Sequence, residues 1–127
     1  ASRDFVSQLT LATLSGNPAY HLPFNSQDGT WNSHVEFGLW ADLMLIAPLS
    51  AASLSKMAHG HSDNLLTTTY LSAKCPVYFA PAMDLDMYVH GSTLANIEKL
   101  KNKTYRTCAV TFYWHKPIFA RETTRSV

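Results

Sequence analysis

Residues 43–60 read LMLIAPLSAASLSKMAHG and join a strand-like pattern to a helix-like one. The apolar start of this stretch is typical of a buried strand, which we expect over residues 42–47 with its end at Pro48. The small, hydroxyl-rich turn that follows predicts a helix over residues 53–59. Backbone N–H groups at the start of such a helix can bind a phosphate, and ligands of open α/β sheets bind where strands end. We therefore expect a phosphorylated cofactor or substrate here, with an ordinary strand-to-helix turn as the alternative.

The rest of the chain alternates helical and strand-like patterns. Apolar periodicity predicts helices over residues 4–15, 34–40, 63–73 and 93–101, and short apolar runs predict strands over residues 19–22 and 77–80. Residues 25–30 have the composition of a polar turn, and residues 105–119 that of a strand or hairpin. Strands alternating with helices predict one α/β domain with a parallel sheet and helical cover.

Composition narrows the classes of function. The 127 residues have a formal net charge of +1, with 10 basic and 9 acidic side chains. This balance favours neither nucleic acid nor a membrane surface as a partner. The two cysteines predict no disulfide framework, so we expect a cytoplasmic protein with Cys75 as a buried thiol. His59 and His61 lack a third ligand nearby, so we expect a polar turn there and no metal. The start of the chain has neither an initiator Met nor a signal-peptide pattern, and we expect it to lie inside a longer protein.

Three segments together resemble one family. They are HVEFGLWAD at residues 34–42, the segment 47–60 followed by DNLL at 63–66, and APAMDLDMY at residues 80–88. In order and spacing they are similar to the motifs of the homo-oligomeric flavin-containing cysteine decarboxylases, most of all the phosphopantothenoylcysteine decarboxylase branch. The likeness covers roughly residues 1–100, so we expect a flavoprotein domain over 1–100 and a divergent tail over 101–127.

The resemblance implies a flavodoxin-like, Rossmann-type domain of three layers that binds FMN. It also implies a homotrimer or higher oligomer with its sites where subunits meet, and a ligase domain fused elsewhere in the full-length protein. The implied substrate is phosphopantothenoylcysteine, decarboxylated to phosphopantetheine in coenzyme A synthesis. Oxidation of the thiol-bearing carbon by the flavin gives a thioaldehyde, which serves as the electron sink for loss of CO2.

The resemblance also assigns roles to particular residues. It implies that His34 is the catalytic base. It implies that FMN is bound by backbone groups and hydroxyls of Ser50, Ala51, Ala52, Ser53 and Ala82. It implies that the substrate is bound by Asp84 and Met83. Each has a plainer alternative: a capping or exposed histidine, an N-cap for the helix, and a packing methionine. Asp63 and Asn64 are expected mainly to cap the helix that follows them.

The chain departs from the family pattern in four ways. The opening strand and its phosphate-binding turn are missing, Ala52 and Asp84 each replace an Asn, and the surroundings of Cys108 do not match the family's proton-donor segment. These departures keep a second hypothesis open, namely a non-catalytic or truncated family member that acts as a flavin-binding or regulatory subunit. A peptidyl-cysteine decarboxylase or a flavin prenyltransferase is a weaker third alternative.

Overall fold

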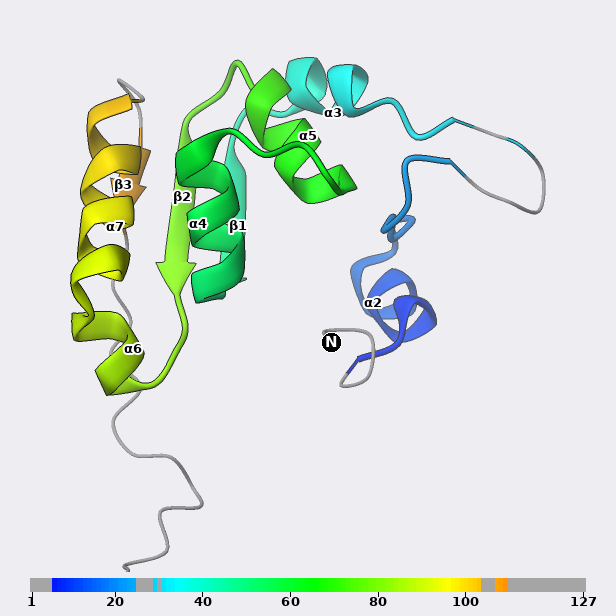
Figure 1. The fold of residues 1–127 in the computed structure, drawn as a ribbon. Helices are drawn as coiled ribbons and strands as arrows, with labels where there is room; N and C mark the ends of the chain where they lie inside the picture. The colour runs from blue at the N-terminus through cyan, green and yellow to red at the C-terminus, as the bar shows by residue number, and fades with distance from the viewer. Residues whose placement is uncertain (1–5, 25–28, 30, 104–106, 110–127) are drawn as a thin grey trace, which may run out of the picture.

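A parallel three-stranded sheet forms the centre of the fold (Figure 1). The computed structural model describes residues 6–24, 29, 31–103 and 107–109. The strands lie in the spatial order β1 (Met44–Leu49), β2 (Val77–Pro81) and β3 (Thr107–Ala109), and both neighbouring pairs are parallel. The predicted α/β class with a parallel sheet is confirmed. Of the strand-like tail, residues 107–109 are described and pair with β2; the rest of the predicted strand or hairpin lies outside the described residues.

Strand β1 ends later than the sequence predicts. Pro48 lies within the strand, because the register between β1 and β2 shifts between Ile46 and Leu49. A proline has no N–H to give to a ladder, so it is accommodated where regular pairing is interrupted. Leu49 then pairs with Pro81, the last residue of β2, and the two strands end side by side.

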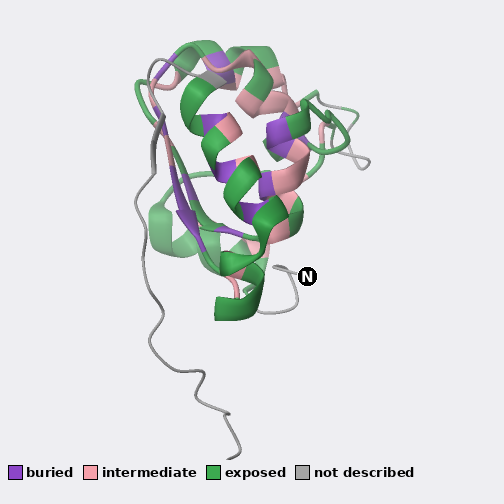
Figure 2. Ribbon diagram, turned by 60° about the vertical axis from the view of Figure 1, so that its left-hand side comes forward, coloured by how far each residue is buried: buried purple, intermediate pink, exposed green. Residues whose placement is uncertain are grey.

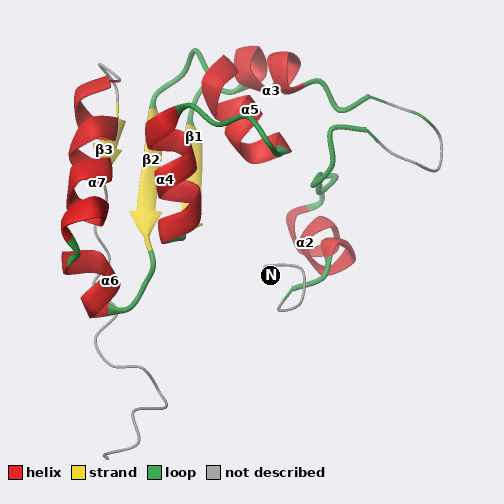
Figure 3. Cartoon of the chain, in the orientation of Figure 1, coloured by secondary structure: helices red, strands yellow, loops and turns green. Residues whose placement is uncertain are grey.

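Helices α4 (Ala51–His59) and α7 (Gly91–Lys103) pack together and cover one face of the sheet (Figures 1 and 3). Between them and the strands lies the apolar core, whose buried members are Ile46, Leu49, Leu54, Met57, Ala58, Val77, Phe79, Ile97 and Leu100. Figure 2 shows the buried positions along the strands and on the facing sides of the helices. Burial of these side chains is the main stabilising term of the fold.

Two further helices pack against each other beside the sheet. They are α3 (His34–Trp40), with the bounds predicted from the sequence, and α5 (Leu65–Ser72). The N-cap of α5 is Asn64, whose side chain accepts a hydrogen bond of 3.1 Å from the backbone N–H of Thr67. This confirms the capping role expected of Asn64 and moves the start of the helix from 63 to 65.

Side-chain caps also reset the starts of two other helices. Helix α2 (Gln8–Ser15) begins after Ser7, whose hydroxyl accepts from the N–H of Thr10 at 3.0 Å; residues 1–5 lie outside the described residues. Helix α4 begins two residues earlier than predicted because Ser50 is its N-cap. Helix α2 buries no residue, and Leu9 on its predicted apolar side is 76% exposed.

The predicted strand over residues 19–22 is wrong. The backbone there makes no ladder, and the neighbouring structure is a single antiparallel bridge between Phe24 and Trp31. The carbonyl of Ala19 accepts from the side chain of Gln8, and Pro23 offers no N–H, so these groups are not available for a ladder. The short helix α6 (Leu85–Val89) was not predicted. In the described part of the chain, no helix is both long and apolar enough to cross a lipid bilayer.

Candidate active site at the carboxyl edge of the sheet

The carboxyl ends of β1 and β2 are tied together by one backbone hydrogen bond. The N–H of Ala82 donates to the carbonyl oxygen of Leu49 at 2.9 Å. Ala82 directly follows β2 and Leu49 is the last residue of β1. The bond therefore places the turn that starts α4 beside the segment that leads into α6, at the edge where α/β sheets bind ligands.

The turn after β1 has the features of an anion-binding helix start. The hydroxyl of Ser50 accepts from the N–H of Ser53 at 3.3 Å and lies 3.3 Å from the Ser53 hydroxyl. In the described part of the chain, no hydrogen bond engages the backbone N–H of Ala51 or Ala52. These groups lie at the positive end of the dipole of a nine-residue helix, and their own side chains are methyl groups. The residues present fit a phosphate-bearing group such as FMN.

The segment after β2 contains the predicted substrate residues. Ala82 is exposed, whereas Met83 is partly buried and packs against the core. Asp84 is the N-cap of α6, and its Oδ1 accepts from the N–H of Met87 at 2.8 Å. Met83 thus packs as its plainer alternative predicts, while the capping role of Asp84 was not predicted. Asp84 remains exposed, so its carboxylate can also face a ligand.

His34 does not join this group of residues. It is the first residue of α3, which precedes the amino end of β1, and its ring meets that of Trp31 edge-on with centroids 6.5 Å apart. The six residues of β1 separate its two ends by about 17 Å at ~3.3 Å per residue. Figure 1 shows α3 beyond one end of the sheet and α6 beyond the other. One chain therefore brings together the predicted residues of the two turns, but not the predicted base.

Gly38 is a structural residue that the sequence reasoning missed. It is buried where α3 crosses α5, and a Cβ there would lie 2.6 Å from the carbonyl oxygen of Ser72. The carbonyl of Gly38 also accepts from the N–H of Lys74 at 3.1 Å. A glycine inside a helix destabilises it by about 1 kcal/mol relative to alanine. A glycine inside the helical pattern of residues 34–40 was therefore the sequence signal that could have indicated a close contact.

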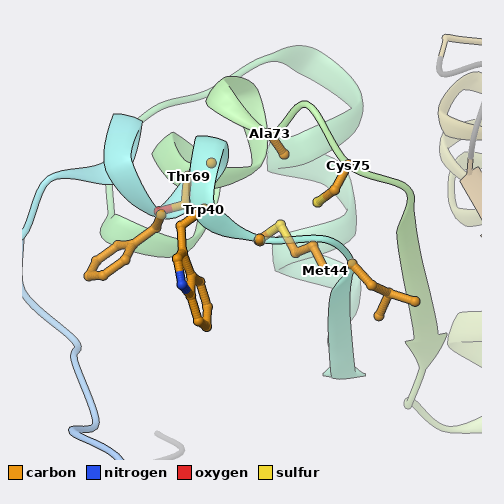
Figure 4. Close-up of a pocket in the computed structure, with 9 residues that line it drawn as sticks. Trp40, Met44, Thr69, Ala73 and Cys75 are labelled. Carbon is orange, nitrogen blue, oxygen red and sulfur yellow. The ribbon is translucent and has the colours of Figure 1, made fainter.

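An apolar hollow of about 190 Å³ lies between α3, α5 and the start of β1 (Figure 4). It is lined by Phe37, Gly38, Trp40, Ala41, Leu43, Met44, Thr69, Ala73 and Cys75. Cys75 is buried, as predicted. The hollow is at the amino end of β1 and so is separate from the two turns at the carboxyl edge.

The polar turn after α4 is held by an ion pair. Lys56 pairs with Asp63, and this contact lowers the pKa of the Asp63 carboxyl below its usual value. The rings of His59 and His61 lie 6.5 Å apart, and His59 Nδ1 is 2.8 Å from the carbonyl oxygen of Ser55. Within the described ranges, no group of three or more His, Cys, Asp or Glu side chains could hold a metal ion.

The fold is that of a flavodoxin-like α/β domain, and the turn after β1 has the geometry of an anion-binding helix start. The chain belongs to the Flavoprotein family, whose model matches residues 1–123. The division into residues 1–100 and a tail stays a prediction.

Relatives and solved structures agree with this family. The chain is 57% identical over 97 residues to a cysteine/cysteine sulfinic acid decarboxylase from an unknown prokaryotic organism, covering 76% of this chain and 27% of the relative. It is 42% identical over 101 residues to the coenzyme A biosynthesis bifunctional protein CoaBC of Bacillus subtilis, covering 80% of this chain and 25% of CoaBC. The crystal structure of the FMN-dependent cysteine decarboxylase SpaF superimposes on this chain with a TM-score of 0.75 at 30% identity. The match covers 85% of this chain and 61% of SpaF. The chain thus spans about a quarter of the length of these two sequence relatives.

Proposed function

We propose that the chain belongs to an FMN-dependent carboxy-lyase that removes CO2 from a cysteine-derived carboxylate. The observation that carries the proposal is the hydrogen bond from Ala82 to Leu49, which unites a phosphate-binding turn with a second polar turn. The Flavoprotein family match and the FMN-dependent structural relative support the choice of flavin.

In this proposal the flavin lies against the start of α4. The N–H groups of Ala51 and Ala52 and the hydroxyls of Ser50 and Ser53 bind and orient it. The exposed residue Ala82 borders the same place from the other turn. When bound, FMN supplies a two-electron oxidation of the thiol-bearing carbon, which makes loss of the neighbouring carboxylate feasible.

His34 is the proposed base, and a second copy of the chain supplies it. Within one chain, α3 and the carboxyl edge lie at opposite ends of β1 (Figure 1). An imidazole can accept a proton near neutral pH, but only within hydrogen-bond reach of the reacting group. A homotrimer or higher oligomer with sites between subunits meets this requirement.

Two substrates are candidates. The relation to CoaBC supports phosphopantothenoylcysteine, with a place in coenzyme A biosynthesis and a ligase in the remaining length of the protein. The greater identity to a cysteine/cysteine sulfinic acid decarboxylase supports a free amino acid instead. Both are cysteine-derived carboxylates, so the reaction class is common to them.

A catalytic test separates this proposal from a flavin-binding subunit without activity. The FMN-loaded protein is given each candidate substrate with a labelled carboxyl group, and released CO2 is counted. We expect release from at least one of them and a loss of about 10²- to 10⁴-fold in His34→Asn. The matched control is His59→Asn. His59 is exposed and lies at the end of α4 opposite the proposed flavin turn, so this variant should keep the rate of CO2 release. Stable FMN binding without any CO2 release would favour the non-catalytic alternative.

A further inference from the structure

We propose that Asp84 makes this site select a substrate with a free α-ammonium group, so that it takes a cysteine-type amino acid in preference to an N-acylated cysteine. The inference rests on the proposed function, because it assigns the substrate class of the same site.

Asp84 is well placed to meet a ligand at the carboxyl edge. It comes two residues after Ala82, whose N–H is bonded to Leu49, and it begins α6 beyond the end of β2 (Figure 1). The hydrogen bond by which Asp84 caps α6 uses Oδ1, which accepts from the N–H of Met87 at 2.8 Å. Among the described residues, no hydrogen bond or ion pair engages the other oxygen, Oδ2, and the side chain is exposed. One carboxylate oxygen is therefore available to a ligand.

The segments that form this edge carry no compensating cation. Residues 43–55 and 75–98 contain no lysine or arginine. Opposite unit charges 4 Å apart attract by about 1 kcal/mol in bulk water and by more where water is excluded, and like charges repel equally. These two segments thus favour a cationic group beside Asp84.

A free amino acid and an N-acylated one differ in charge at the reacting end. In the free amino acid the α carbon bears an ammonium as well as the carboxylate, so the ammonium can donate to Asp84 while the charges of the pair cancel. In the N-acylated compound the nitrogen is a neutral amide, the carboxylate is uncompensated, and a phosphate ester adds further negative charge. An asparagine would tolerate both compounds, whereas an aspartate discriminates between them.

Asp84→Asn tests the assignment cleanly. Asn is as good an N-cap as Asp, so α6 keeps its start while the charge is removed. The kcat/KM for CO2 release is measured on the FMN-loaded protein with L-cysteine and with N-acetyl-L-cysteine. We expect the protein to prefer L-cysteine, and the variant to lose about tenfold to a hundredfold of that preference, mainly through the KM for L-cysteine.

Asp86→Asn is the matched control, because it removes the same charge two residues away on the same exposed helix. It should leave the ratio within about twofold, since a carboxylate that makes no direct contact with the ligand acts only through solvent and is screened by salt. Binding of L-serine and N-acetyl-L-serine, followed through the flavin spectrum, repeats the comparison with ligands that have no thiol to oxidise.

The results separate this inference from the proposed function. A preference for N-acetyl-L-cysteine, or an unchanged ratio in Asp84→Asn, overturns the role of Asp84 while decarboxylation stands. Release of CO2 from neither of these compounds nor from phosphopantothenoylcysteine, together with no discrimination between the serine ligands, overturns both.

Discussion

The backbone N–H of Ala82 and the carbonyl oxygen of Leu49 are 2.9 Å apart and form a hydrogen bond. Each residue lies where a parallel strand gives way to a helix-starting turn, so the bond fixes the distance between those turns. A ligand that touches both turns has its position set by the sheet rather than by a loop, which is how α/β folds make a precise site.

A negative charge in the first turn of α4 should weaken flavin binding without harming the fold. In Ala52→Glu the carboxylate faces the positive end of the helix dipole, which favours folding, but it competes with the phosphate of the flavin. We expect a weakening of at least about tenfold in the Kd for FMN, measured by flavin fluorescence quenching. Ser92→Glu places the same charge in the first turn of α7 and should bind FMN like the parent. Equal affinity in both variants would place the flavin elsewhere.

Two inactive variants should restore activity when they share an oligomer. The His34→Asn chain keeps an intact turn after β1, and the Ala52→Glu chain keeps an intact His34. If the base and the flavin turn come from different chains, co-expression forms some sites with both parts intact, and CO2 release returns. The control is each variant co-expressed with itself. A mixed oligomer as inactive as its parents would mean that each chain builds its site alone.

Gly38→Ala should destabilise the chain by about 1–3 kcal/mol, because an added Cβ would meet the backbone of Ser72 at 2.6 Å. Chemical denaturation measures the change in the free energy of unfolding. Gly91→Ala is the matched control: a Cβ there meets nothing within 4 Å, and it should cost little or stabilise α7 by up to about 1 kcal/mol. A Gly38→Ala variant as stable as Gly91→Ala would contradict the close packing of α3 on α5.

The ion pair between Lys56 and Asp63 should give a pH-dependent stability. Because Lys56 lowers the pKa of Asp63 in the folded chain, the unfolded state binds the proton more readily. Its contribution is fully present above the ordinary value of 3.8 and is lost as the pH falls through the lower folded value. Denaturation of the parent and of Asp63→Asn at several pH values checks this. The two should differ slightly at neutral pH and converge in acid, and a difference that grows in acid would have the wrong sign.

Much of this fold could be predicted because the deciding patterns are local. The apolar runs before Pro48 and Pro81 indicated β1 and β2, and the helix predicted over residues 34–40 has the bounds of α3. Where a predicted helix boundary was wrong or a helix was missed, a capping side chain sets the start of the helix. Ser50 begins α4 early, and Asp84 starts a helix too short to show a period.

In the candidate site too, features set by neighbouring residues could be predicted, whereas features set by contacts between distant segments could not. The residues of the two turns were found from their motifs, and the sheet does bring them together. The separation of His34 from those turns and the approach of Gly38 to Ser72 depend on contacts between distant segments. A single sequence does not encode such contacts in any local pattern.

Whether the purified chain retains flavin decides whether the turn after β1 is an FMN site. The protein is purified, its visible spectrum is recorded, and any flavin released by denaturation is identified and counted per chain. The account predicts FMN, bound with a stoichiometry that approaches one per chain and lost in Ala52→Glu but not in Ser92→Glu. A colourless protein that also takes up no added FMN would contradict it, and the decarboxylase proposal would fall with it.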